Sequence, residues 1–152
     1  MKRTGLTLTL IASLFAGSAF ADEAAEQAIK TRQALMGLYA FNLGGLGAMA
    51  KGTVPYDAET AGAYAANLVS LSSLNQTGLW PQGSDIGSYP DSAALPKIWS
   101  MYPDVLVKAK GLTEAATAMN AVAGTDLASL QGAMGKVGGA CGACHKSYRQ
   151  KK

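Results

Sequence analysis

The chain has 152 residues, with 13 Lys and Arg against 10 Asp and Glu and a single His, so its formal net charge is +3. Basic residues are scattered except at the C-terminus, and aromatic residues do not alternate with them, so the pattern typical of nucleic-acid-binding surfaces is excluded. The length suits one domain with a single hydrophobic core.

The first residues have the layout of a secretory signal peptide. Two basic residues precede an apolar run over 6–15, and small residues follow up to Ala21. The run is about half the roughly 20 apolar residues that a membrane-spanning helix needs, and no second such run follows. We therefore predict a cleaved signal peptide over 1–21, export to the periplasm, and a mature domain over 22–152 that has no membrane span.

Apolar residues recur at steps of three and four in four segments, which is typical of helices with one apolar face. The four rows are Ile29, Met36 and Leu43; Ala61, Tyr64, Leu68 and Leu71; Ile98, Tyr102, Val105, Ala109, Leu112, Ala116 and Met119; and Leu127, Leu130, Met134, Val137, Cys141, Cys144 and Tyr148. Strand patterns are almost absent. We predict an all-α fold in which four helices bury these rows against one another as a bundle.

Turn-forming and capping residues separate the four segments. The stretch KGTVPYD breaks the first helix with Gly and Pro, and its last residue, Asp57, can cap the second helix. Pro96 suits the first position of the third helix, and Thr125 or Asp126 can cap the fourth. The connection between Leu74 and Leu95 is too long for a tight hairpin, so we expect it to cross the bundle or to line a ligand pocket.

Both cysteines and the only histidine lie in the stretch CGACH, as Cys141, Cys144 and His145. On a helix the two cysteines share a face, and the histidine points to the neighbouring edge of that face. This spacing is the attachment signature of c-type haem, in which two thiols form thioethers with the porphyrin and the imidazole is the proximal iron ligand. We predict one covalently bound haem c at these residues.

Three other interpretations of the same residues are open. A zinc site needs about four ligands, so with no further Cys or His it would have to recruit carboxylates. A thioredoxin-like redox pair is expected at the start of a helix after a strand, whereas this pair lies near the end of the last helix. A disulfide across two intervening residues closes a very small loop and stabilises little. The context favours haem.

The chain resembles the class II c-type cytochromes, most closely the cytochrome c′ family. The segments that carry the resemblance are TRQALM, GAMAKGTVPYDA, PKIW and CGACHKSYR, and in this order they cover essentially the whole mature chain. The resemblance implies an antiparallel four-helix bundle with the haem held between helices. It also implies a homodimer that packs through the first two helices.

The resemblance implies further haem contacts. Arg32 and Gln33 match an Arg-Gln pair beside the haem, where a guanidinium suits a propionate. Met36 matches the residue over the distal face, where it either blocks the iron or ligates it through its thioether; its heptad spacing predicts that it faces the core. Arg149 matches an arginine beside the proximal ligand, His145.

The segment WPQGSDIGSYPDSAALPKIW is longer than the family pattern and departs from it. We therefore assign Trp80, Tyr89 and Trp99 to packing rather than to haem contact.

The carboxylates gather near predicted helix ends and form no evident acid–base constellation, so we expect a binding or redox protein and not an enzyme. We predict a five-coordinate, mainly high-spin haem that binds NO or CO, takes part in periplasmic electron transfer, or both, with Met36 gating the iron without binding it. The alternative is a low-spin electron carrier with His and Met ligands. A third hypothesis is a four-helix structural protein without haem.

Overall fold

The computed structural model describes residues 15–151, which fold almost entirely into helices. The elements are α1 (Phe15–Ala50), α2 (Ala58–Ser72), the 3-10 turn η1 (Thr77–Leu79), α3 (Lys97–Ser100), α4 (Tyr102–Asn120) and α5 (Leu127–Tyr148). Within the described part of the chain, extended pairing is limited to one isolated bridge between Ala94 and Arg149. The predicted all-α class is confirmed. The predicted signal peptide lies mostly outside the described residues, and its cleavage stays a prediction.

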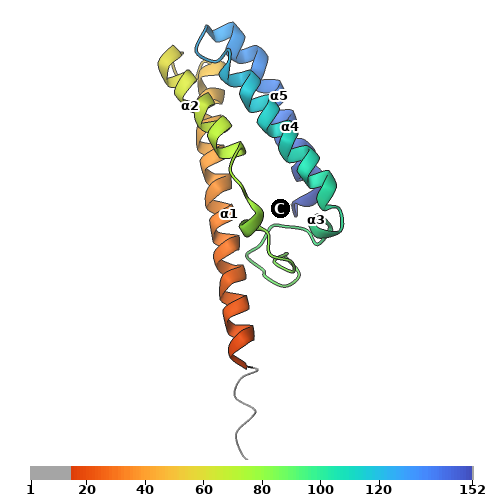
Figure 1. Cartoon of the computed structure of the whole chain (residues 1–152). Coiled ribbons are helices and arrows are strands. Elements are labelled where there is room, and N and C mark those ends of the chain that lie inside the picture. Colours follow the sequence, from red (N-terminus) through yellow and green to blue (C-terminus); the bar gives the residue numbers. More distant parts are fainter. Residues whose placement is uncertain (1–14, 152) are drawn as a thin grey trace, which may run out of the picture.

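The four long helices form an antiparallel bundle (Figure 1). Helix α1 packs against α2 and α5, and α4 packs against the same two helices, so each helix has two neighbours. The first half of α1 extends beyond α2, and the long connection between α2 and α3 lies beside it. The four-helix bundle expected from the apolar rows is therefore confirmed. No helix of residues 15–151 has both the length and the hydropathy that a bilayer crossing requires.

The predicted helix caps are present. The Asp57 carboxylate accepts a hydrogen bond from the backbone N–H of Thr60 at 2.8 Å, and Asp126 accepts one from Ser129 at 2.7 Å. Of the two candidates for the last cap, Asp126 rather than Thr125 fills the position. Both side chains satisfy backbone N–H groups that a helix start leaves without partners.

The third predicted helix is divided in two, which corrects the sequence analysis. Helix α3 ends at Ser100, and α4 starts at Tyr102 after Met101 leaves the helical region with φ −121° and ψ 29°. Pro103, in the first turn of α4, has no N–H and its ring clashes with the carbonyl four residues earlier, so one continuous helix cannot form. Pro96 is the N-cap of α3 and not its first helical residue.

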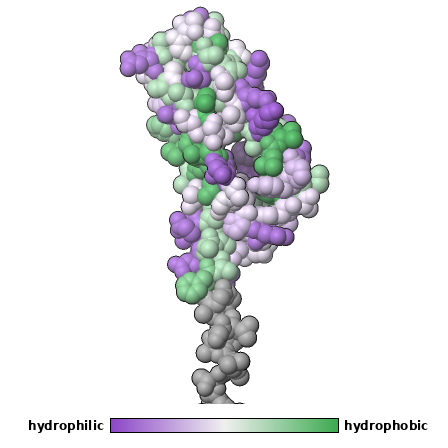
Figure 2. Space-filling model, in the orientation of Figure 1, coloured by the Kyte–Doolittle hydropathy of each residue, from purple (hydrophilic) through white to green (hydrophobic). Residues whose placement is uncertain are grey.

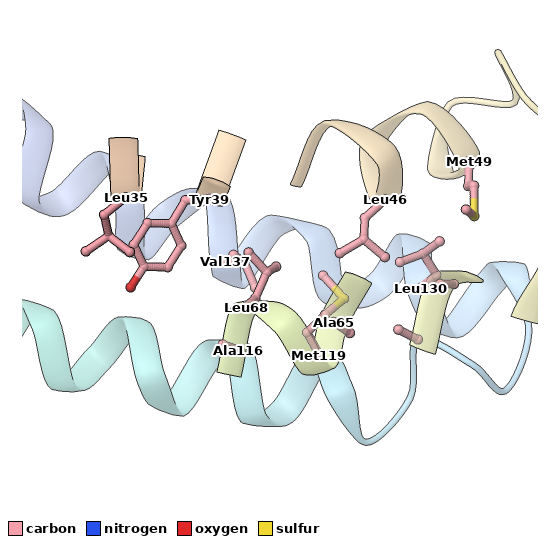
Figure 3. Close-up of a cluster of buried hydrophobic side chains, with 12 residues drawn as sticks. Leu35, Tyr39, Leu46, Met49, Ala65, Leu68, Ala116, Met119, Leu130 and Val137 are labelled. Atoms are coloured by element: carbon pink, nitrogen blue, oxygen red, sulfur yellow. The ribbon is translucent and has the colours of Figure 1, made fainter. Parts of the chain in front are cut away.

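All four long helices contribute to one main hydrophobic cluster (Figure 3). Its buried members are Leu35, Tyr39, Leu46, Met49, Ala61, Ala65, Leu68, Ala116, Met119, Ala123, Leu130 and Val137. Many are alanines, which allow helices to approach closely. A second, smaller cluster joins Ala94, Ile98 and Tyr148 at the end of the bundle where α5 finishes.

Candidate haem site

Helix α5 turns the Cys-x-x-Cys-His motif toward the interior. Cys141, Cys144 and His145 are partly buried, and they continue the face that buries Val137 and Tyr148. The two thiols are not joined to each other. Burial raises the pKa of each cysteine, and burial together with the nearby Arg149 lowers the pKa of His145. Burial thus favours an uncharged imidazole, the form that ligates metals.

A polar network lies beside Cys144. The hydroxyl of Tyr148 donates to Asp104 Oδ2 at 2.5 Å, and Lys108 Nζ lies 2.9 Å from the same oxygen. This bond to a carboxylate raises the pKa of Tyr148 to about 12. Cys144 packs against the second cluster, which contains Tyr148. The apolar row of the last helix included Tyr148, but nothing in the sequence pattern paired it with Asp104.

On α1 the predicted Arg32 is buried, with 5% of its surface exposed. Its Nη1 donates to the Leu79 carbonyl at 3.0 Å and to Ser84 Oγ at 2.8 Å, and its Nη2 donates to Ser92 Oγ at 2.9 Å and to the Ser84 carbonyl. The guanidinium also lies 4.9 Å from the centre of the Trp80 ring. It forms no ion pair with a carboxylate of the described residues, so this buried cation has no anionic partner in residues 15–151.

Tyr39 is a site residue that the apolar rows missed. It lies two turns after Arg32 on α1, is 8% exposed, and its hydroxyl is the buried side-chain atom for which residues 15–151 provide no hydrogen-bond partner. In Figure 3 this hydroxyl points away from Leu46 and Leu130. Burial, followed by the proximity of Cys141, raises the pKa of Tyr39 to about 12, and the side chain of Gln76, which is nearby but outside direct hydrogen-bond geometry, offsets part of the rise. The steps from Leu35 to Tyr39 and on to Leu46 follow the helical period, so this row was present in the sequence.

The other predicted site residues lie near the surface. Gln33 is exposed and donates to the Asp91 carbonyl at 2.6 Å. Met36 is 37% exposed and belongs to neither hydrophobic cluster. The prediction that it faces the hydrophobic core is therefore wrong. Its neighbour Leu35 takes the inward position of that turn. Arg149 is exposed directly after α5.

The long connection contacts both α1 and the C-terminal end of α5. Arg32 binds it from one side, while the N–H of Leu95 donates to the Tyr148 carbonyl at 2.9 Å and the N–H of Gln150 donates to the Ala93 carbonyl at 2.8 Å. Tyr89 donates to Asp22 at 3.0 Å, so this residue makes a polar contact and is in neither cluster. The predicted connection across the bundle is therefore present.

The same connection lines a cavity of about 350 Å³. Its walls are Thr77, Trp80 and Gln82 from the connection and Trp99 and Tyr102 from α3 and α4. Figure 2 shows a hollow in this region between α1 and α4. Trp80 and Trp99 are partly buried in the second cluster, as predicted for packing residues, and Trp99 Nε1 donates to the Trp80 carbonyl at 3.2 Å.

These residues fit a covalently attached haem. Two unlinked thiols and an imidazole of lowered pKa lie on one face of α5, a buried guanidinium without a carboxylate partner lies on α1, and the Tyr39 hydroxyl, which makes no direct hydrogen bond within residues 15–151, lies near Cys141. A porphyrin offers groups that complement each: vinyls for the thiols, iron for the imidazole, and propionates for the cation.

Comparisons with known proteins identify the family of this chain. A family model described as Cytochrome C′ matches residues 27–149. Cytochrome c-554 of Cereibacter sphaeroides is 52% identical over 146 residues, 95% of each chain, and cytochrome c′ of the same organism is 37% identical over the whole of both chains. A solved cytochrome c′ structure from Rhodobacter sphaeroides superposes with a TM-score of 0.82 at 36% identity, covering 84% of this chain and 98% of that one. This chain therefore belongs to the cytochrome c′ family, whose members carry covalently attached haem c.

Proposed function

We propose that residues 22–152 form an exported one-electron carrier whose haem is attached through Cys141 and Cys144, with His145 as the proximal iron ligand. The observation that carries this proposal is the placement of the two unlinked thiols and the imidazole on one partly buried face of α5. When bound, haem supplies an iron that accepts and releases one electron. Mass spectrometry of the periplasmic protein tests the export step, with an N-terminus at Asp22 expected.

The residues of this chain would hold and orient the group. Arg32 offers a cation to the propionates, because its guanidinium is buried and unmatched by a carboxylate of the described residues. Burial, and after it the nearby Arg149, lowers the pKa of His145 and so favours the uncharged imidazole that binds iron. No residue is required to move a proton, which suits the electron-transfer and gas-binding proteins of this family.

The role of Met36 decides between two forms of the site, one in which its thioether binds the haem iron and one in which it only shields the iron. Met36 is 37% exposed as a residue and packs in neither hydrophobic cluster, which weakens the case for a purely packing role. We infer that Met36 would supply a thioether to the haem iron, which would make the protein a low-spin electron carrier.

A second candidate function is gas binding at a five-coordinate haem, with Met36 as a gate. It is favoured by a solved relative, a cytochrome c prime variant from Alcaligenes xylosoxidans described as carbon monoxide bound, which is 33% identical to this chain with a TM-score of 0.72.

Electronic and resonance Raman spectra of the purified holoprotein distinguish the two functions. A six-coordinate low-spin spectrum with a methionine-to-iron charge-transfer band is expected, and Met36→Ala should abolish that band. Met101→Ala is the matched control, because Met101 is an exposed methionine outside α1. A five-coordinate spectrum in the unchanged protein, with faster CO binding in Met36→Ala, would instead establish the gas-binding form. A colourless protein with free thiols would refute both.

We also propose a homodimer that packs through α1 and α2. Leu38 and Phe41 on α1 are 51% and 66% exposed, and the Phe41 ring meets Tyr64 of α2 edge-on at 5.8 Å between ring centres. A solved cytochrome c′ at 28% identity is described as having ligand-controlled dimer dissociation. Sedimentation equilibrium is expected to show a dimer, and Phe41→Glu to shift it to monomer, because a buried carboxylate at an apolar contact is unfavourable.

A further inference from the structure

A buried tyrosine at the end of α5 is held through its ring, its carbonyl and its hydroxyl. Tyr148 is 3% exposed and belongs to the second hydrophobic cluster. Its carbonyl accepts a hydrogen bond from the N–H of Leu95 at 2.9 Å, and its hydroxyl donates to Asp104 Oδ2 at 2.5 Å. Of these two hydrogen bonds, the one to Asp104 reaches α4, so it ties the last turn of α5 to that helix.

This last turn carries part of the haem motif. Tyr148 lies three positions after His145 and four after Cys144, and side chains at these spacings are neighbours on a helix surface. Cys144 packs against the cluster that contains Tyr148. The N–H of Arg149 donates to the His145 carbonyl at 3.2 Å, so the helix is intact between the histidine and the tyrosine. A rotation of the turn at Tyr148 would therefore move both the imidazole and one attachment point of the haem.

The environment of Asp104 favours a charged carboxylate. The residue lies in the first turn of α4, where the helix dipole stabilises an anion. Lys108 Nζ lies 3.0 Å from its Oδ1 and 2.9 Å from its Oδ2. The Lys108 side chain is 23% exposed and that of Asp104 is 40% exposed, whereas the side chains of the other two ion pairs within residues 15–151 are at least 58% exposed. A charged, partly buried carboxylate is a strong acceptor for the Tyr148 hydroxyl.

We propose that Asp104 is a positioning residue for the haem, because it holds the last turn of α5, and with it His145, through the hydroxyl of Tyr148. The proposal rests on the role of His145 as proximal ligand, proposed above. Groups outside the ligand shell orient a ligating imidazole and thereby tune the metal that it binds. If Asp104 acts through Tyr148, variants at either end of the hydrogen bond should change the same property of the haem. If Asp104 acts by charge alone, removal of the tyrosine hydroxyl should change nothing.

Proton NMR of the ferric holoprotein tests the proposal, because the pattern of hyperfine-shifted haem methyl resonances depends on the orientation of the imidazole plane. Tyr148→Phe should alter this pattern, and Asp104→Ala should alter it in the same sense. The double variant should add little to either change, since both substitutions remove one bond. Asp104→Asn keeps an acceptor for the hydroxyl and should retain most of the original pattern. Spectroelectrochemical titration of Tyr148→Phe should show a change of about threefold in the redox equilibrium constant.

Two substitutions elsewhere serve as matched controls. Tyr56→Phe also removes a tyrosine hydroxyl, one that donates to the Ala123 carbonyl at 2.9 Å beyond the other end of α5. Glu114→Ala also removes a carboxylate of α4 that pairs with a lysine four residues away, here Lys110 at 3.6 Å. Neither group contacts Tyr148 in the described part of the chain. Both variants should keep the methyl pattern of the unchanged protein.

The possible failures are distinguishable. The positioning role is wrong if Tyr148→Phe leaves the methyl pattern unchanged while Asp104→Ala alters it, or if Tyr56→Phe alters it as much as Tyr148→Phe. Tyr148→Phe keeps the ring in the hydrophobic cluster, so it provides the test even where Asp104→Ala does not mature. A holoprotein that cannot be reduced and reoxidised in the titration would refute the electron-transfer function instead, while the methyl pattern would still test Asp104.

Discussion

Replacing Arg32 with methionine should release the long connection from α1 while keeping the length of the side chain. The guanidinium donates four hydrogen bonds to the connection, to Leu79, to Ser92 and twice to Ser84. Each such bond contributes about 1 kcal/mol net, and its loss leaves a buried acceptor without a partner. The removal of a buried charge offsets part of this loss, because an unpaired cation is costly to bury.

The balance is a local destabilisation of about 3 kcal/mol, which corresponds to roughly a hundredfold increase in the population of the open connection. Hydrogen exchange of the holoprotein measures this population directly. The amides of Ile86 and Tyr89 are suitable probes, because they donate to the carbonyls of Ala94 and Asp85 within the connection, each at 2.9 Å. Both are expected to lose about a hundredfold in protection.

Gln33→Ala is the matched control, because Gln33 is the next residue and makes a single exposed hydrogen bond to the same connection. Its effect should stay within about 0.5 kcal/mol. If Arg32→Met leaves the amides of Ile86 and Tyr89 as protected as before and changes only the haem spectrum, the argument is refuted, and Arg32 acts on the propionates alone.

Three further predictions concern attachment and stability. Replacing both Cys141 and Cys144 with alanine should make the haem extractable with acidified organic solvent, and haem that stays attached would contradict the proposed thioethers. Leu46→Ala should lower the free energy of unfolding by about 3 kcal/mol in urea denaturation, because this side chain is fully buried, and a loss below about 1 kcal/mol would contradict the packing. The backbone hydrogen bond to Ser129 lowers the pKa of Asp126, so its stabilising effect is present above roughly pH 4 and is lost as pH falls through the folded pKa. Asp126→Asn should therefore melt at a lower temperature than the unchanged protein at pH 6, and the two melting temperatures should converge at low pH.

The bundle could be predicted because its causes are local in sequence. Helical period places Leu130 and Val137 on one face, and the capping role of Asp57 depends on a residue three positions away. The break before α4 also has a local cause, Pro103, which the spacing of apolar residues alone does not reveal. A search for proline within the row from Ile98 to Met119 would have found it.

The partners of the site side chains could not be predicted in the same way. Arg32 binds Ser84 and Ser92, which are 52 and 60 residues further along the chain, and neither serine belongs to a periodic row. Tyr148 binds Asp104 across 44 residues. Such contacts depend on how the helices and the connection pack, so the motif indicates the chemistry of the site and the fold determines its polar surroundings.

The connection between α2 and α3 joins the α1 side of the site to the α5 side. Ser84 and Ser92 receive the guanidinium of Arg32 on α1, and the residues just after them, Ala93 and Leu95, pair with the chain that follows His145. The connection thus links the helix of the proposed sixth ligand to the end of the helix that carries the proximal one. The Arg32 guanidinium on α1 binds Ser84 and Ser92, and backbone hydrogen bonds join Ala93 and Leu95 to the end of α5. A shift of α1 relative to α5 must therefore break hydrogen bonds of the connection. This coupling explains why a segment outside the haem motif is held by so many buried polar contacts.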